Sequence, residues 1–234
     1  MLHRMINLRY KDDPKASRRW VPASWVTTQQ LNEYWSNFNI AAYIASTSPS
    51  RDLESTKCRT HKEQASHKFG RPGKGGWLYA CTPDGYIVHL KEYAGVESIP
   101  QRYFFLAEIV EEDENGEIVV VVHDDACHLK KYCLNRCGEG EFAKKLSLLF
   151  FIIDRLHAKG HVDDWCEANC HPDAECNVPH VAGLNTSVCE QQFSSLSRHK
   201  FVIRSMQPLN SALLLIETAE SRNIDLLEKH EKAL

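Results

Sequence analysis

The feature that most constrains the fold of this chain is the uninterrupted β-branched run Ile118–Val122, which follows a break at Glu114-Asn115-Gly116. Continuous apolar runs of this length are typical of strands buried on both faces, in sheets that helices cover on each side. The run ends in His-Asp-Asp at 123–125, so two carboxylates stand at the carboxyl end of the strand, where open α/β sheets bind ligands. The sequence therefore predicts an α/β domain with an acidic edge, and a solvated acidic turn is the alternative.

Turn residues and apolar periodicity predict the elements around this strand. Aromatic and β-branched residues at 77–81 and 86–90 flank a Pro-Asp-Gly turn, which is the composition of a β-hairpin. The apolar spacing predicts helices over the ranges 100–109, 142–156, 187–206 and 208–230. The resulting order of elements indicates one α/β domain, interrupted once by a segment that is short of core residues. We expect the strand at 118–123 to lie centrally in a mixed sheet, beside the hairpin at 77–91.

Length and charge narrow the class of protein. With 234 residues, the chain fits one α/β domain with a small insert. Its net charge of -3 gives no global basic signature, so contacts with DNA would depend on a local patch such as residues 198–204. No signal peptide and no apolar run of membrane-spanning length are visible, so we expect an intracellular protein without a membrane partner.

A second constraint comes from nine cysteines and twelve histidines. In a reducing compartment, such residues favour metal ligation over disulfides. Six of them fall within a segment that has few core residues, so we expect three or four of the six to bind one Zn²⁺: His157, His161, Cys166, Cys170, His171 and Cys176. A loop with incidental thiols is the alternative. No Cys-x-x-Cys is present, which argues against thioredoxin-like chemistry.

The other cysteines give weaker patterns. Cys127, Cys133 and Cys137 repeat in reverse the cysteine spacing of the 166–176 segment, which indicates either a second half-site or a coincidence. Cys81 and Cys189 are isolated in the sequence, and we expect them to be small core residues.

Three motifs resemble those of Kyakuja-Dileera-Zisupton (KDZ) DNA transposases. The strand with its extension Val122–Leu129 resembles their strand-plus-Asp-x-Ala-Cys element. Asp154-Arg155-Leu156-His157 resembles a Cys/Asp-x-x-His motif found in several eukaryotic transposase superfamilies. Residues 185–194 resemble the segment that carries the last catalytic acid, and the Glu-x-x-Phe-Ser core of this segment is similar to that of hAT transposases. The resemblance covers residues 56–206.

The resemblance implies an RNase H-like mixed sheet flanked by helices, with an Asp-Asp-Glu set that binds Mg²⁺ or Mn²⁺. Asp124 matches the second acid and Glu190 the third, Asp125 is a neighbouring acid, and Asp154 and His157 form the auxiliary motif. The implied organisation has four parts: a helical or irregular extension over 1–45, the first part of the core over 46–156, the Cys/His-rich insert over 157–185, and C-terminal helices that complete the core over 186–234.

The chain departs from this family at the first acid, which belongs on the first strand, ahead of the hairpin. No acid stands in an apolar strand context near 50–62, and the candidates are Asp52, Glu54, Asp84 and Glu97. Two functions follow. One is a DNA strand transferase or nuclease of transposable-element origin, and the other is a catalytically silent, zinc-containing module that binds DNA or protein. Both predict DNA as a partner and a nuclear location, and both are compatible with a homo-oligomer.

Overall fold

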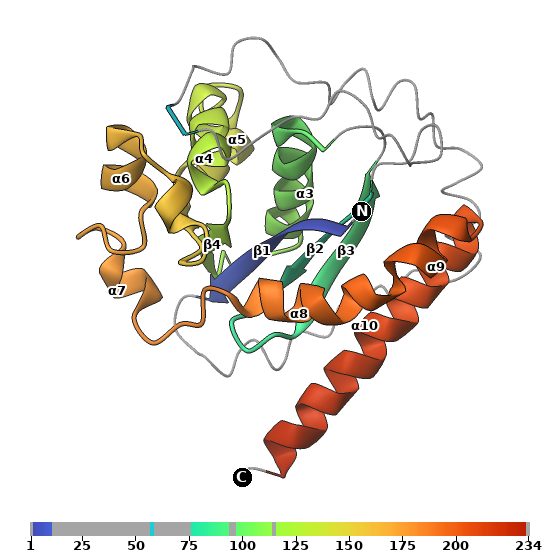
Figure 1. Ribbon diagram of the computed structural model, residues 1–234. Coiled ribbons are helices and arrows are strands. Elements are labelled where there is room, and N and C mark those ends of the chain that lie inside the picture. The colour runs from blue at the N-terminus through green and yellow to red at the C-terminus, as the bar shows by residue number, and fades with distance from the viewer. Residues whose placement is uncertain (1, 11–56, 59–75, 94–96, 114–115, 233–234) are drawn as a thin grey trace.

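A five-stranded mixed sheet forms the centre of the protein. The computed structural model describes residues 2–10, 57–58, 76–93, 97–113 and 116–232 (Figure 1). The strand order is β3-β2-β1-β4-β5, with the bounds β1 Leu2–Tyr10, β2 Gly76–Cys81, β3 Ile87–Tyr93, β4 Ile118–His123 and β5 Phe150–Ile153. β2 is parallel to β1 and antiparallel to β3, whereas β4 is antiparallel to β1 and parallel to β5.

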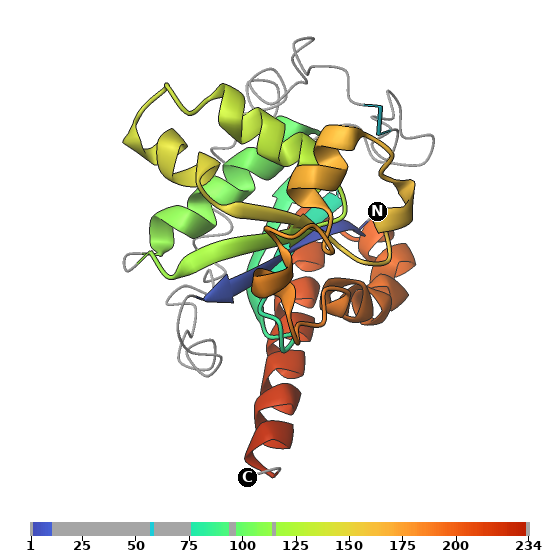
Figure 2. The same ribbon diagram turned by 90° about the vertical axis from the view of Figure 1, so that its left-hand side faces the viewer.

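Helices cover the sheet on both faces, as Figures 1 and 2 show. The helices that contribute to the larger core cluster are α3 (Ile99–Glu112), α4 (Ala126–Asn135), α5 (Glu141–Ser147) and α6 (Asp164–Cys170). Those that contribute to the two smaller clusters are α7 (Val178–Val181), α8 (Val188–Leu196) and α10 (Pro208–Glu231), with α9 (Lys200–Ser205) preceding α10. Two short 3-10 turns, η2 (Ala158–Gly160) and η3 (Ser197–His199), complete the described elements.

The two-residue period of β2 decides which helices it contacts. Leu78 and Ala80 belong to the core under α3 and α4, whereas Trp77, Tyr79 and Cys81 belong to the core under α8 and α10. Successive side chains of a strand point to opposite faces, and all five of these are apolar and buried. β2 therefore joins two cores, and its last residue, Cys81, lies against the α8 side.

The long helix α10 is fixed to the edge of the sheet by one buried side chain. Asn223 accepts a hydrogen bond from the backbone N–H of Ile87 at 2.8 Å and donates one to the carbonyl of the same residue at 2.8 Å. These two bonds satisfy backbone groups of β3 at the edge of the sheet. The C-terminal part of α10 extends beyond the sheet (Figure 1). None of the described helices is both long enough and apolar enough to cross a membrane.

Much of the predicted element order is confirmed. The hairpin forms as β2 and β3, the helix predicted over 100–109 is α3, and the β-branched run is the interior strand β4. The two C-terminal helical segments are confirmed as α8 with α9, and as α10. The sheet is mixed and helix-covered, as the β-branched run predicts.

The single helix predicted over 142–156 is wrong. The chain instead forms the short helix α5 and then β5, whose residues Phe151, Ile152 and Ile153 are fully buried beside β4. Apolar spacing in this stretch fits a helix as well as a strand, and the parallel pairing with β4 decides for the strand.

β1 is the second difference between prediction and structure. Residues 2–10 belong to the predicted N-terminal extension, yet they form a strand that lies between the hairpin and β4. The prediction that the hairpin lies directly beside the β-branched strand is therefore wrong. The remainder of the extension lies outside the described residues. The same holds for the first strand expected near 50–62, except for Lys57 and Cys58, and for the candidate acids Asp52 and Glu54.

Candidate metal centre and acidic site

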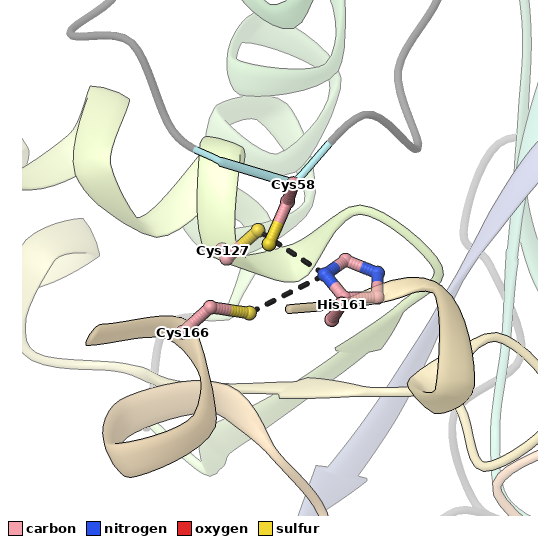
Figure 3. Close-up of side chains that lie close together, drawn as sticks. All are labelled: Cys58, Cys127, His161 and Cys166. Carbon is pink, nitrogen blue, oxygen red and sulfur yellow. Dashed lines mark hydrogen bonds between the residues drawn. The ribbon is translucent and has the colours of Figure 1, made fainter. Parts of the chain in front are cut away.

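Four buried side chains form a compact Cys/His set at one end of the sheet. Cys58, Cys127, His161 and Cys166 each offer one ligand atom, and these atoms all lie within 4.8 Å of one another. Figure 3 shows the three thiols directed toward the same edge of the imidazole ring. The His161 Nδ1 atom lies 3.4 Å from the Cys127 Sγ atom and 3.3 Å from the Cys166 Sγ atom. Three sulfur ligands and one nitrogen ligand are a set that proteins use for tetrahedral metal ions such as zinc.

The set is assembled from three separate stretches of chain, of which one supplies both His161 and Cys166. Cys127 lies in the first turn of α4, directly after β4, and Cys166 lies in α6. Asp163 caps α6 by accepting hydrogen bonds from the backbone N–H groups of Trp165 and Cys166. Its other carboxylate oxygen accepts a bond from the Lys57 backbone N–H at 3.0 Å, which fixes the residue next to Cys58. One carboxylate therefore aligns two of the four members.

The second ring nitrogen of His161 is also satisfied. Its Nε2–H donates to the carbonyl oxygen of Asp124 at 2.8 Å. Because a carbonyl can only accept, this bond places the ring hydrogen on Nε2 and leaves the Nδ1 lone pair facing the thiols. Histidines that bind metals are oriented in this way, by a hydrogen bond from the nitrogen that does not bind the metal.

Two of the thiols, Cys58 and Cys127, are held neutral without a metal. The hydrogen bond with Cys166, together with burial, raises the pKa of Cys127 to about 11, and burial raises the pKa of Cys58. A bound cation reverses this preference, because only thiolates ligate well and binding releases their protons. The donor set and its burial fit a metal such as zinc.

The structure brings together only two of the six predicted zinc ligands. Of the six, His161 and Cys166 belong to the set. The others do not: His157 contacts Asp154, Cys170 is buried in the core one helical turn after Cys166, the ring of His171 accepts from the backbone N–H of Asp173, and Cys176 is exposed. Ligands drawn from one local segment were therefore the wrong model for this site.

Cys58 and Cys127 are the members that sequence reasoning missed. There was some indication of Cys127 in the sequence, because it comes directly after the buried strand. It also belongs to the trio Cys127, Cys133 and Cys137, whose reversed spacing had two interpretations. Cys133 and Cys137 do not join the set, so the trio is not a second half-site. Cys58 has no local signal, because its partners are 69 or more positions away in the chain.

An acidic site lies at the carboxyl ends of β4 and β5. Asp124 follows β4 and Asp154 follows β5, and because the two strands are parallel both carboxylates stand at the same edge of the sheet. Glu190 comes from the first turn of α8. His157 Nδ1 lies 3.3 Å from an Asp154 oxygen and His157 Nε2 lies 4.0 Å from a Glu190 oxygen.

His157 is the centre of this acidic site. The hydrogen bond with Asp154 raises the pKa of His157 above its ordinary value, and the charges of Asp124, Asp154 and Glu190 add to the increase. Burial alone would raise the pKa of Asp154, but its bonds with His157 and Ser187 outweigh burial and lower it. Thr186 also donates to Asp154 at 3.2 Å. The site therefore stabilises an ionised carboxylate beside an imidazolium.

Asp125 lies in the core and not in the acidic site. Its side chain has no exposed surface, and one of its oxygens accepts from Arg102 Nη1 at 3.0 Å. Its other oxygen contacts His128. Arg102 also donates to Glu97 at 2.9 Å. Asp125 is thus the buried partner of a cation, and the order Asp124-Asp125 puts one carboxylate at the edge of the sheet and the next one inside.

The described candidates for a first acid lie elsewhere. Asp84 accepts from the Thr82 hydroxyl in the turn between β2 and β3, and Glu97 pairs with Arg102. β1, which by chain order is the first strand, contains neither Asp nor Glu. Asp154 is the third carboxylate that the structure adds to Asp124 and Glu190, and the family resemblance implied only an auxiliary role for it.

Comparison of the chain with protein-family models, with curated proteins and with solved structures gives no match.

Proposed function

We propose that this chain is a transposase-derived domain of the KDZ type, in which Asp124, Asp154, His157 and Glu190 form a divalent-cation site for phosphodiester chemistry on DNA. One observation carries the proposal: the carboxylates of Asp154, which follows β5, and of Glu190 in α8 lie 3.3 Å and 4.0 Å from the two ring nitrogens of His157, at the edge of the sheet where Asp124 follows β4. The motif resemblance requires Asp124 and Glu190 to meet although they are far apart in the chain. An RNase H-like core is part of the proposal, and the mixed, helix-covered sheet supports it.

The residues of the acidic site fit a hard cation. Asp124, Asp154 and Glu190 offer the oxygen ligands that Mg²⁺ and Mn²⁺ prefer. A bound ion would lower the pKa of an attacking water or 3′-hydroxyl and offset charge on the phosphate. In the metal-free protein, the raised pKa of His157 favours its imidazolium form, which places positive charge beside Asp154 and Glu190. Asp154 is held in position by Thr186 and Ser187, so its carboxylate is already oriented for a cation.

The Cys/His set has a structural role in this proposal, and zinc is its occupant. A set of four protein ligands closes a tetrahedral zinc site and leaves no open position for a substrate. Bound zinc would tie the segment at Cys58 to α4 and α6. It would also hold His161, whose Nε2–H bond fixes the backbone of Asp124. Zinc therefore contributes to the geometry of the acidic site without taking part in the chemistry.

A second candidate is a catalytically silent module that binds DNA or protein. The absence of any acid on β1 favours it, together with the structural use of Asp84 and Glu97. With fewer carboxylates than the Asp-Asp-Glu set requires, the same fold would keep its zinc and its binding surface while losing the reaction.

One experiment separates the two candidates. Zinc-loaded protein is incubated with double-stranded DNA and Mn²⁺ or Mg²⁺, and strand cleavage is measured alongside DNA binding without the divalent ion. We expect Asp124→Asn and Glu190→Gln each to reduce cleavage at least about 100-fold, as loss of a catalytic electrostatic contact does. Asp173→Asn, which changes an exposed carboxylate paired with Arg155, is the matched control and retains cleavage. Binding without cleavage in the unmodified chain would establish a silent DNA-binding module, and neither binding nor cleavage would refute both the nuclease and the DNA-binding module.

A further inference from the structure

Two thiols outside the Cys/His set lie unusually close together. The Sγ atoms of Cys81 and Cys189 are 3.1 Å apart, and both side chains are buried. A disulfide bond requires about 2.05 Å between the two sulfur atoms, so a displacement of about 1 Å would bring them to bonding distance. Both cysteines are free thiols in this structure.

The fold positions these two thiols independently of any bond between them. Cys81 is the last residue of β2 and Cys189 lies in the first turn of α8. The Tyr79 hydroxyl donates to the carbonyl of Cys189 at 2.8 Å, which ties the backbone of α8 to the same strand. Ile87 and Val188 belong to the same core cluster as the two cysteines. The pair is therefore preorganised, and the sulfur–sulfur bond itself can form with little displacement from this arrangement.

We propose that Cys81 and Cys189 are an oxidation site. A peroxide oxidises the two thiols, and an intrachain disulfide bond forms between them. The two thiols give up two hydrogen atoms, that is two protons and two electrons, to hydrogen peroxide. The oxygen–oxygen bond breaks, two water molecules form, and a sulfur–sulfur bond joins β2 to α8. The reverse reaction needs a dithiol. By thiol–disulfide exchange, the dithiol is oxidised to a disulfide and the two cysteines return to free thiols.

Burial sets the conditions of this reaction. Cys81 has no exposed surface and Cys189 has 7%. Burial, together with the hydrogen bond to Cys81, raises the pKa of Cys189 and so favours its neutral thiol, the form that reacts slowly with peroxides. Oxidation therefore requires the first turn of α8 to open locally, after which the neighbouring thiol closes the bond.

The position of the bond gives it a consequence for the acidic site. Cys189 immediately precedes Glu190, whose carboxylate lies 4.0 Å from the His157 ring. A disulfide would hold this turn of α8 against β2 and limit the movement of Glu190. This consequence rests on the proposed function, whereas the formation of the bond does not.

Peptide mapping of the full-length, zinc-loaded chain tests the proposal. Reduced protein is treated with increasing hydrogen peroxide, remaining thiols are blocked, and cross-linked peptides are identified by fragmentation. We expect the bond between Cys81 and Cys189 to be the main cross-link and to disappear with a dithiol. Cys189→Ser should abolish it, while Cys176→Ser, which removes an exposed thiol near Cys189 in the sequence, should leave it intact.

Two outcomes would overturn the inference: no cross-link at a peroxide concentration that oxidises exposed Cys137 completely, or a cross-link from Cys81 to a cysteine other than Cys189. If Cys189→Ser does not fold, the fragmentation spectrum of the unmodified chain still assigns the bond. DNA cleavage by the oxidised and reduced forms is compared separately. Absence of cleavage in both would count against the proposed function and leave the disulfide assignment unaffected.

Discussion

Asp124 and Asp125 are neighbours in the chain, yet the structure predicts opposite effects of replacing them. The Asp125 carboxylate and the Arg102 guanidinium are 3.0 Å apart, and their side chains are 0% and 1% exposed. Removing one partner of a buried ion pair costs about 3–5 kcal/mol, because the remaining charge stays in the core. In Asp125→Asn, Arg102 keeps Glu97 at 2.9 Å and the amide oxygen can still accept, so we expect the lower end, about 3 kcal/mol.

This loss should be visible as a shift in thermal unfolding. For a chain of this size, each kcal/mol corresponds to about 2–4 °C, so the midpoint of Asp125→Asn should fall by about 6–12 °C. Asp124→Asn should change the free energy of unfolding by less than about 1 kcal/mol, because the His161 bond goes to its backbone carbonyl, which remains.

The assay is circular dichroism melting and urea unfolding of both variants with zinc bound, followed by the DNA cleavage measurement. Asp125→Asn is expected to lose stability, whereas Asp124→Asn is expected to keep its stability and lose cleavage. Equal midpoints for Asp125→Asn and the unmodified chain would refute the assignment of a structural role to Asp125. A larger loss of stability in Asp124→Asn than in Asp125→Asn would refute the distinction altogether.

Three further predictions follow from the same structure. Cys166→Ser should lose the single equivalent of zinc expected by elemental analysis, whereas Cys170→Ser, a buried thiol of the same helix outside the set, should retain it. Burial alone lowers the pKa of His128, but the hydrogen bonds and charges of Asp125 and Cys127 together outweigh burial and raise the pKa to about 9. The stability that His128 contributes is therefore complete below about pH 6.5 and lost as the pH rises through 9, and a urea series should show no such decline in His128→Gln. Asn223→Ala should cost about 2–3 kcal/mol in urea unfolding, because both backbone groups of Ile87 lose their partners; an unchanged midpoint would contradict the anchoring of α10 to β3.

The sequence was sufficient for elements whose signal is local. The β-branched run at 118–122 could only be buried on both faces, so an interior strand covered by helices followed from composition alone. Pro83-Asp84-Gly85 fixed the hairpin, because turn residues act over a few positions. The helix prediction for residues 150–153 was wrong because the local signal there is ambiguous. These apolar residues suit a helix or a strand, and only pairing with β4 distinguishes the two.

What the sequence determined by itself is the chemistry available to this protein: thiols and imidazoles for a metal such as zinc, and carboxylates at the end of a buried strand. Tertiary structure alone decided which of them meet. His161 and Cys166 join Cys58 and Cys127 across the fold, and Asp154 joins Asp124 because β4 and β5 run parallel. The physical reason is that ligation and ion pairing act over a few ångströms in space. The distance between two residues along the chain does not decide whether they can share a metal ion or form an ion pair. A ligand set built from distant segments is therefore defined only once the sheet and its helices have packed.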